Sequence, residues 1–171
     1  MIYVKNSTKC DNLTGTRIGE TYKITFTKSI RNLTPSYHYL TSSKTEIASD
    51  YYTLGTAGSR TGIKILHTGI YHIQFTNAYF EVSGGDNIVW AIVGSTRLGD
   101  AAAFISAQYT ADTKNSRISV CAGGITELFE GEVVYCGVAK SSVYSGIVDF
   151  APYDDIKYNG TLTVTYLGQN N

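Results

Sequence analysis

The stretch HTGIYHIQFTNAYFEV, residues 67–82, constrains the fold more than any other part of the sequence. Apolar and polar residues alternate along it, which is the two-residue period of a strand with one buried face. The apolar residues stand first at odd and then at even positions: Tyr71, Ile73, Phe75, Phe80 and Val82. This slip in phase near Asn77–Ala78 predicts a β-bulge that bends a long strand.

The rest of the chain carries the same kind of signal. The composition is rich in glycine (17) and tyrosine (14) and poor in proline (2), and no window shows a sustained helical period. Further strands are predicted at 21–30, 61–66, 87–94, 101–110, 116–124, 130–139 and 160–168, with 34–59 and 140–158 as loops or short edge strands. Roughly eight to ten short strands separated by glycine-rich turns such as 83–86 predict an all-β protein, an antiparallel β-sandwich or jelly roll. We expect a single domain over residues 19–171.

Charge and composition exclude several classes of protein. The chain has 14 basic and 14 acidic residues and only 16% charged residues, so nothing favours nucleic acid or an anionic membrane as a partner. No apolar stretch is long enough to cross a bilayer, and the first 15 residues do not resemble a secretory signal. Cys121 and Cys136 stand in apolar runs and are expected to be small buried side chains, a disulfide between them being the alternative. Trp90 lies in a continuous apolar run, which predicts a strand covered on both faces and disfavours a glycan platform.

The sequence offers no candidate active site. The three histidines, His38, His67 and His72, have no metal-ligand spacing, and no cofactor or metal site is expected. Asp154 and Asp155 would point to opposite faces of an extended segment, so they do not form an acid–base pair. We therefore predict a non-enzymatic protein.

The glycine and alternating residues Gly69, Tyr71, Ile73 and Phe75 resemble a stretch of the globular heads of complement's first recognition component and their tumour-necrosis-factor-like (TNF-like) relatives. Two later segments are also similar to this family, a turn into a late strand and a turn into the last strand: Leu128, Gly131 and Glu132, then Asn159, Gly160 and Leu162. Glu132 stands where the family usually has aspartate. The resemblance implies a jelly roll that assembles as a homotrimer, here in a form resembling bacteriophage head or tail fibre proteins.

The second face of the opening strand agrees with assembly. His72, Gln74 and Thr76 are polar but uncharged, and so are Thr161, Thr163 and Thr165 on the last predicted strand. A flat, uncharged face that can form hydrogen bonds suits packing against copies of itself around an axis. We expect these six residues at a trimer interface near the three-fold axis; an ordinary solvated face is the alternative.

Residues 1–18 lack clean alternation and are expected to form an N-terminal arm. The segment contains scattered apolar residues: Ile2, Tyr3, Val4, Leu13 and Ile18. It is too apolar for a solvated tail and too short to build a core, so it could attach the trimer to other virion proteins. The equal alternative is that it completes the sheet of its own subunit.

These expectations converge on a structural and binding protein of a bacteriophage virion: a trimeric head or tail fibre, or a capsid decoration knob. Such a protein would be assembled in the host cytoplasm, with itself, other virion proteins and a host-surface glycan as partners. The alternative is a bacterial surface or secreted trimeric binding module of the same fold. Genes for capsid or tail proteins next to this one would favour the virion, and a secretion neighbourhood would favour the alternative.

Overall fold

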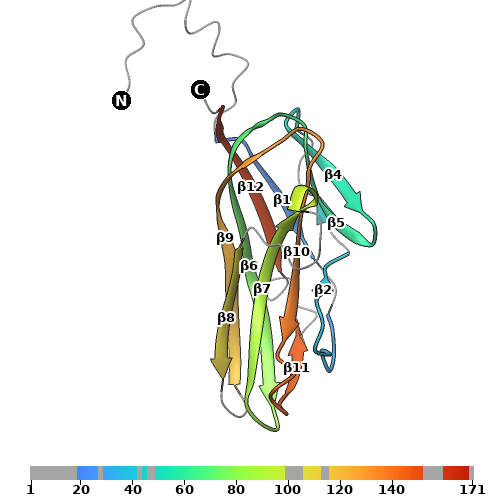
Figure 1. Cartoon of the computed structure of the whole chain (residues 1–171), viewed down its shortest axis with the longest axis vertical. Helices are drawn as coiled ribbons and strands as arrows, with labels where there is room; N and C mark the ends of the chain where they lie inside the picture. The colour runs from blue at the N-terminus through green and yellow to red at the C-terminus, as the bar shows by residue number, and fades with distance from the viewer. Residues whose placement is uncertain are drawn as a thin grey trace, which may run out of the picture.

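The computed structural model describes residues 19–26, 29–41, 44–45, 49–98, 106–112, 116–151 and 160–169. Within this part of the chain the structure is almost entirely β, with one short 3-10 helix at Thr96–Leu98 (Figure 1). The strands are β1 (Thr21–Thr25), β2 (His38–Tyr39), β3 (Lys44–Thr45), β4 (Tyr52–Ala57), β5 (Arg60–Ile65), β6 (Gly69–Ser83), β7 (Asn87–Ser95), β8 (Ser106–Asp112), β9 (Ser116–Leu128), β10 (Val133–Lys140), β11 (Ile147–Phe150) and β12 (Thr161–Gly168). The all-β prediction is confirmed.

The strands form two antiparallel sheets that pack face to face. The first sheet, here the β6 sheet, has the order β11-β6-β12-β1-β3, with β9 paired to the other edge of β6. The second, here the β7 sheet, has the order β4-β5-β10-β7-β8, with β2 paired to β10. No described helix is long and apolar enough to span a membrane.

The core lies between the inner faces of these sheets. Alternate residues of β6 are buried while their neighbours are partly exposed, as the two-residue period predicts. From the β7 sheet, alternate side chains of β10 point inward as well, including Val134, Cys136 and Val138, all fully buried. These residues belong to one continuous apolar cluster.

The predicted bulge in β6 is present. The register between β6 and β9 shifts between Phe75, opposite Ala122, and Ala78, opposite Val120, so β6 carries one extra residue. Asn77 takes the left-handed conformation there, with φ at 57°. Asparagine tolerates this conformation better than most residues. The extra residue turns the inward positions from odd to even, so Phe80 faces the core like Phe75.

Gly69 opens β6 because a side chain would not fit there. A Cβ at this position would lie 2.5 Å from a ring carbon of Tyr166 and 2.7 Å from the carbonyl oxygen of Gly168. The aromatic ring of Tyr166 therefore lies directly over the glycine backbone. The glycine of the family-like pattern serves close packing between β6 and β12.

Some of the sequence predictions need correction. The strand predicted at 116–124 continues as β9 to Leu128. β4 and β11 lie at sheet edges, in agreement with the short edge strands expected within 34–59 and 140–158. The prediction that Cys121 is buried is wrong, because its side chain is exposed on β9. Cys121 and Cys136 are both free thiols. Trp90 is only partly buried, so β7 is not covered on both faces at that position.

Candidate interface on the outer face of the β6 sheet

Strand pairing brings the six predicted interface residues into one patch. β12 lies beside β6, with Thr161 opposite Thr76, Thr163 opposite Gln74 and Thr165 opposite His72. Directly opposed residues on antiparallel strands project to the same face of a sheet. Their inward neighbours Tyr71, Ile73, Phe75, Leu162 and Val164 are buried, so the patch faces outward.

The six side chains differ in how much surface they leave open. Gln74 is exposed, and His72, Thr76, Thr163 and Thr165 are partly exposed. Thr161 is only 7% exposed within the single chain, which leaves little of it for a partner. The outer-face hydroxyls of β1 and β12 also bond to each other, Thr21 Oγ1 lying 2.8 Å from Thr165 Oγ1.

β9 extends the patch with residues that the sequence analysis missed. Ile125 is opposite His72 and Gly123 is opposite Gln74. Ile125 is 67% exposed, which is unusual for a large apolar side chain in the middle of a strand. Small or apolar residues at Cys121, Gly123 and Ile125 were the available signal, because a solvated strand face would carry charges there.

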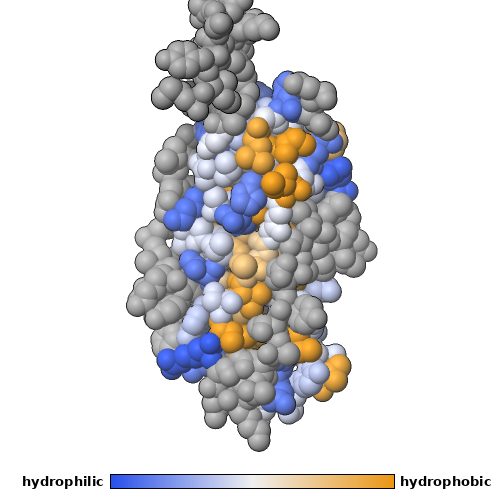
Figure 2. All heavy atoms as spheres, turned by 90° about the vertical axis from the view of Figure 1, so that its left-hand side faces the viewer, coloured by the Kyte–Doolittle hydropathy of each residue, from blue (hydrophilic) through white to orange (hydrophobic). Residues whose placement is uncertain are grey.

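A shallow groove runs along the junction of β6 and β9. It encloses about 370 Å³ and is lined by His72, Gln74, Thr76 and the β9 residues 121–124. Figure 2, turned to the side that carries β8 and β9, shows apolar side chains in a broken stripe along the length of the molecule. The groove forms because the glycines of β9 have no side chains to pack beside the outward side chains of β6.

Charged groups border the patch. Arg117 and Glu81 form an ion pair of 3.6 Å across β9 and β6, beyond the bulge. At the other end of the paired segment Glu127 is opposite Ile70. Lys23 on β1, opposite Thr163, is the charged side chain that enters the patch, and it is partly exposed.

Glu132, the family-like carboxylate at the start of the late strand, has a structural role. Its Oε1 accepts a hydrogen bond from the Phe129 amide at 3.2 Å and an ion pair from Arg97 Nε at 3.0 Å. Gly131, with φ at 89°, makes the turn that brings the glutamate back to the Phe129 amide. The carboxylate is therefore used to close the turn before β10.

The shifted titratable groups lie inside the core. Desolvation raises the pKa of Tyr52 and Tyr71 and that of the fully buried Cys136 thiol. Burial keeps these groups protonated and away from solvent, which suits packing rather than nucleophilic or acid–base chemistry. Among the described residues, no group of three His, Cys, Asp or Glu side chains could hold a metal ion.

The proposed attachment residues cannot be placed. Ile2, Tyr3, Val4, Leu13 and Ile18 lie outside the described residues. The 1–18 arm stays a prediction from the sequence.

Comparison with known proteins identifies the fold. The structure is similar to a solved structure described as "Structure of Eiger TNF from S. frugiperda", with a TM-score of 0.56 over 91% of this chain and 96% of that chain. The chain has a TNF-like jelly-roll fold. Sequence identity is 14%, so the likeness concerns the fold alone. No protein-family model matches the sequence of this chain, and the search of curated proteins found no match to it.

Proposed function

We propose that this chain is a non-enzymatic, homotrimeric structural and binding protein of a bacteriophage virion. The observation that carries the trimer is the outer face of the β6 sheet, where β1, β12, β6 and β9 together present an almost uncharged patch. Isolated soluble sheets usually place charged residues on a solvated face. Polar side chains without charge can instead be buried against a copy of themselves when they form hydrogen bonds there, at a much smaller desolvation cost than charged groups.

The virion setting is supported by the sequence. The strands are rich in tyrosine, glycine and threonine and poor in charge, and a short, partly apolar segment precedes the sandwich. In this proposal residues 1–18 attach the trimer to other virion proteins, while the jelly roll projects from the particle and contacts the host surface. Mass spectrometry of purified particles tests the setting, and detection of the chain on a bacterial cell surface without particles would favour a surface binding module instead.

The trimer is tested by placing a charge at the centre of the patch. Gln74→Glu keeps the size of the side chain and would bring three carboxylates together if this face packs around a three-fold axis. We expect the association free energy to weaken by about 3–5 kcal/mol, because charges buried without partners are strongly destabilising. Size-exclusion chromatography with light scattering over a range of concentrations measures the change.

Glu81→Gln is the matched control. It changes one charge on the outer face of the same strand, outside the patch, where loss of an exposed ion pair has little effect. The wild type should be a trimer, Glu81→Gln should remain one, and Gln74→Glu should dissociate. A monomeric or dimeric wild type would refute the trimer, and an unchanged Gln74→Glu trimer would show that another face is used.

A further inference from the structure

A pocket opens on the outer face of the opposite sheet, the β7 sheet. Trp90 and Ile92 of β7 and Ala139 of β10 contribute from the strands, Trp90 and Ala139 being cross-strand partners. Pro35 and Tyr37 contribute from the segment before β2. The enclosed volume is about 370 Å³. That volume is near the lower end for small-molecule sites, enough for about one or two sugar rings.

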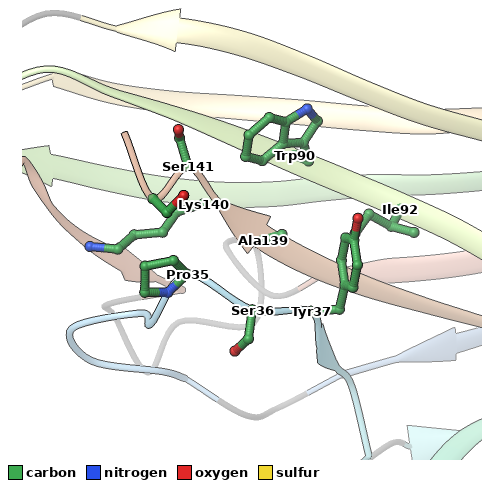
Figure 3. Close-up of a pocket in the computed structure, with 9 residues that line it drawn as sticks. Pro35, Ser36, Tyr37, Trp90, Ile92, Ala139, Lys140 and Ser141 are labelled. Carbon is green, nitrogen blue, oxygen red and sulfur yellow. The ribbon is translucent and has the colours of Figure 1, made fainter. Parts of the chain in front are cut away.

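The side chains leave a slot between facing walls. Figure 3 shows Trp90 and Pro35 on opposite sides of the space, with Tyr37 and Ile92 together closing one end. Ala139 lies between these side chains at the bottom of the slot, and its single methyl group leaves space above it. Lys140 extends its ammonium group toward the other end.

The loop that forms one wall is held in place. His38 Nε2 lies 3.0 Å from both Thr34 Oγ1 and Ser36 Oγ, which ties the segment to the start of β2. β2 itself packs tightly on Gly137, where a Cβ would lie 2.8 Å from the His38 carbonyl oxygen. A pocket whose walls are fixed before binding loses less entropy when a ligand enters.

The chemistry of the lining selects an amphipathic ligand. Trp90 and Tyr37 offer flat aromatic surfaces, and both carry a polar group that can bond at the rim. Tyr37 remains 48% exposed, so its ring is accessible. The pyranose ring of a saccharide has one face of C–H groups and a rim of hydroxyls, which suits a slot with aromatic walls and a wet mouth.

Among the described residues that line the pocket, one side chain is charged, and it is basic. Lys140 Nζ donates a hydrogen bond to the Gly146 carbonyl oxygen at 3.2 Å, which fixes the ammonium group and leaves two further donors. Within the part of the chain that the structure describes, no carboxylate lines the pocket. This charge favours a ligand with an anionic group at one end.

We propose that the pocket binds an acidic saccharide, with the sugar ring against Trp90 and Tyr37 and its carboxylate at Lys140. The inference rests on the binding role proposed above but not on the trimer, because the pocket lies on the sheet opposite the assembly patch. It also revises the expectation that the surroundings of Trp90 are too apolar for a glycan. Val89 and Ala91, the apolar neighbours of Trp90 in sequence, point into the core, whereas the Trp90 ring lies on the outer face of the sheet and lines the pocket.

Trp90 reports on the pocket directly because it is the single tryptophan of the chain. Titration of the full-length protein with methyl glucuronide should change the tryptophan fluorescence in a saturable way. Methyl glucoside differs from it only in having a hydroxymethyl group in place of the carboxylate. We expect it to bind at least about tenfold more weakly, as loss of a charge-assisted hydrogen bond implies.

Four variants separate a specific site from a general surface effect. Tyr37→Ala removes an exposed ring and Lys140→Gln removes the charge, and each should weaken glucuronide binding about tenfold or more. Lys140→Arg keeps the charge and should retain binding. Leu54→Ala removes another exposed apolar side chain of the same sheet, outside the pocket, and should bind like the wild type.

Light scattering on the same samples distinguishes the two proposals. Saturable glucuronide binding by a monomeric protein would uphold the pocket and refute the trimer. A trimer whose fluorescence responds to neither sugar, or equally to both, overturns the assignment to an acidic saccharide. Equal glucuronide binding by Tyr37→Ala and the wild type overturns it as well.

Discussion

At the scale of single residues, tyrosines build one end of the core. Tyr52 of β4 lies between the sheets with Tyr71 of β6 and Tyr166 of β12; the ring centroids of Tyr52 and Tyr71 are 6.0 Å apart, and those of Tyr71 and Tyr166 are 5.2 Å apart. The Tyr52 hydroxyl donates to the Glu20 carbonyl oxygen at 2.8 Å, and the Tyr71 hydroxyl donates to that of His67. The Tyr52 and Tyr71 hydroxyls thus each have an acceptor, which avoids a large desolvation penalty for these two groups.

These tyrosines predict how stability depends on pH. Desolvation, with repulsion from neighbouring phenolates second, raises the pKa of Tyr52 and Tyr71 above the unfolded value of about 10. Their contribution is therefore complete below about pH 10 and is lost as the pH rises toward the pKa of the folded state. In this range each tyrosine should lower the free energy of unfolding by about 1.4 kcal/mol per pH unit. Urea denaturation between about pH 8 and 12 measures the slope.

Tyr52→Phe isolates one of the two groups. It should lower the free energy of unfolding at neutral pH by about 1 kcal/mol, through loss of one hydrogen bond, and make the alkaline slope shallower by about one proton. Tyr144→Phe, on an exposed side chain, should leave the profile unchanged. A wild-type stability that stays constant far above pH 10 would show that the phenols do not ionise on unfolding.

At the scale of elements, β6 shows what local sequence determines. Alternation fixes the side of the sheet on which each residue lies, so the bulge and both faces of β6 were predictable from residues 69–82. The sequence could not distinguish β4 from a loop, because its exposed and buried positions do not alternate. The part of the patch on β9 was missed because it depends on which strand pairs with β6, and residues more than forty positions apart meet there.

The bulge in β6 gives a prediction about deletion. Removing Asn77 takes out the one extra residue, after which Ala78, Phe80 and Val82 continue the alternation of Tyr71, Ile73 and Phe75. We therefore expect the Asn77 deletion to unfold cooperatively, with a stability within about 3 kcal/mol of the wild type, because every core side chain still points inward. Circular dichroism during thermal denaturation measures this.

Deleting Ser119 from β9 is the control. Ser119 is opposite Tyr79 in a regular part of the ladder, so its loss turns one half of β9 over. Either Ile118, before the deletion, or Val120 and Ala122, after it, would then face solvent, and cooperative folding should be lost. If both deletions behave alike, the extra residue in β6 is not what sets its two phases.

At the scale of the whole molecule, the two outer faces of the sandwich have different characters. The β6 sheet presents the almost uncharged patch, and the β7 sheet presents the aromatic pocket with Lys140. If the outer face of the β6 sheet is buried in a trimer, the three pockets on the β7 sheets point away from the three-fold axis. Three weak sites on one trimer would bind a glycan surface multivalently without any change in the single site. The uncharged residues of β6 and β12 were recognisable in the sequence, but the pocket on the opposite face was not, since it depends on which strands lie side by side.

If the two outer faces serve assembly and ligand binding as proposed, residues 1–18 are the candidate for attaching the trimer to the virion, and this gives the last prediction. Residues 1–18 are outside the described residues, and their scattered apolar side chains suit docking onto another surface, for example as a strand added to a sheet edge. The protein lacking residues 1–18 should still form trimers by light scattering and respond to methyl glucuronide through Trp90. It should no longer appear in purified particles when it replaces the full-length chain. If the truncated protein fails to fold, the segment completes the sandwich of its own subunit instead. If it folds and still joins the particle, attachment uses one of the two outer faces.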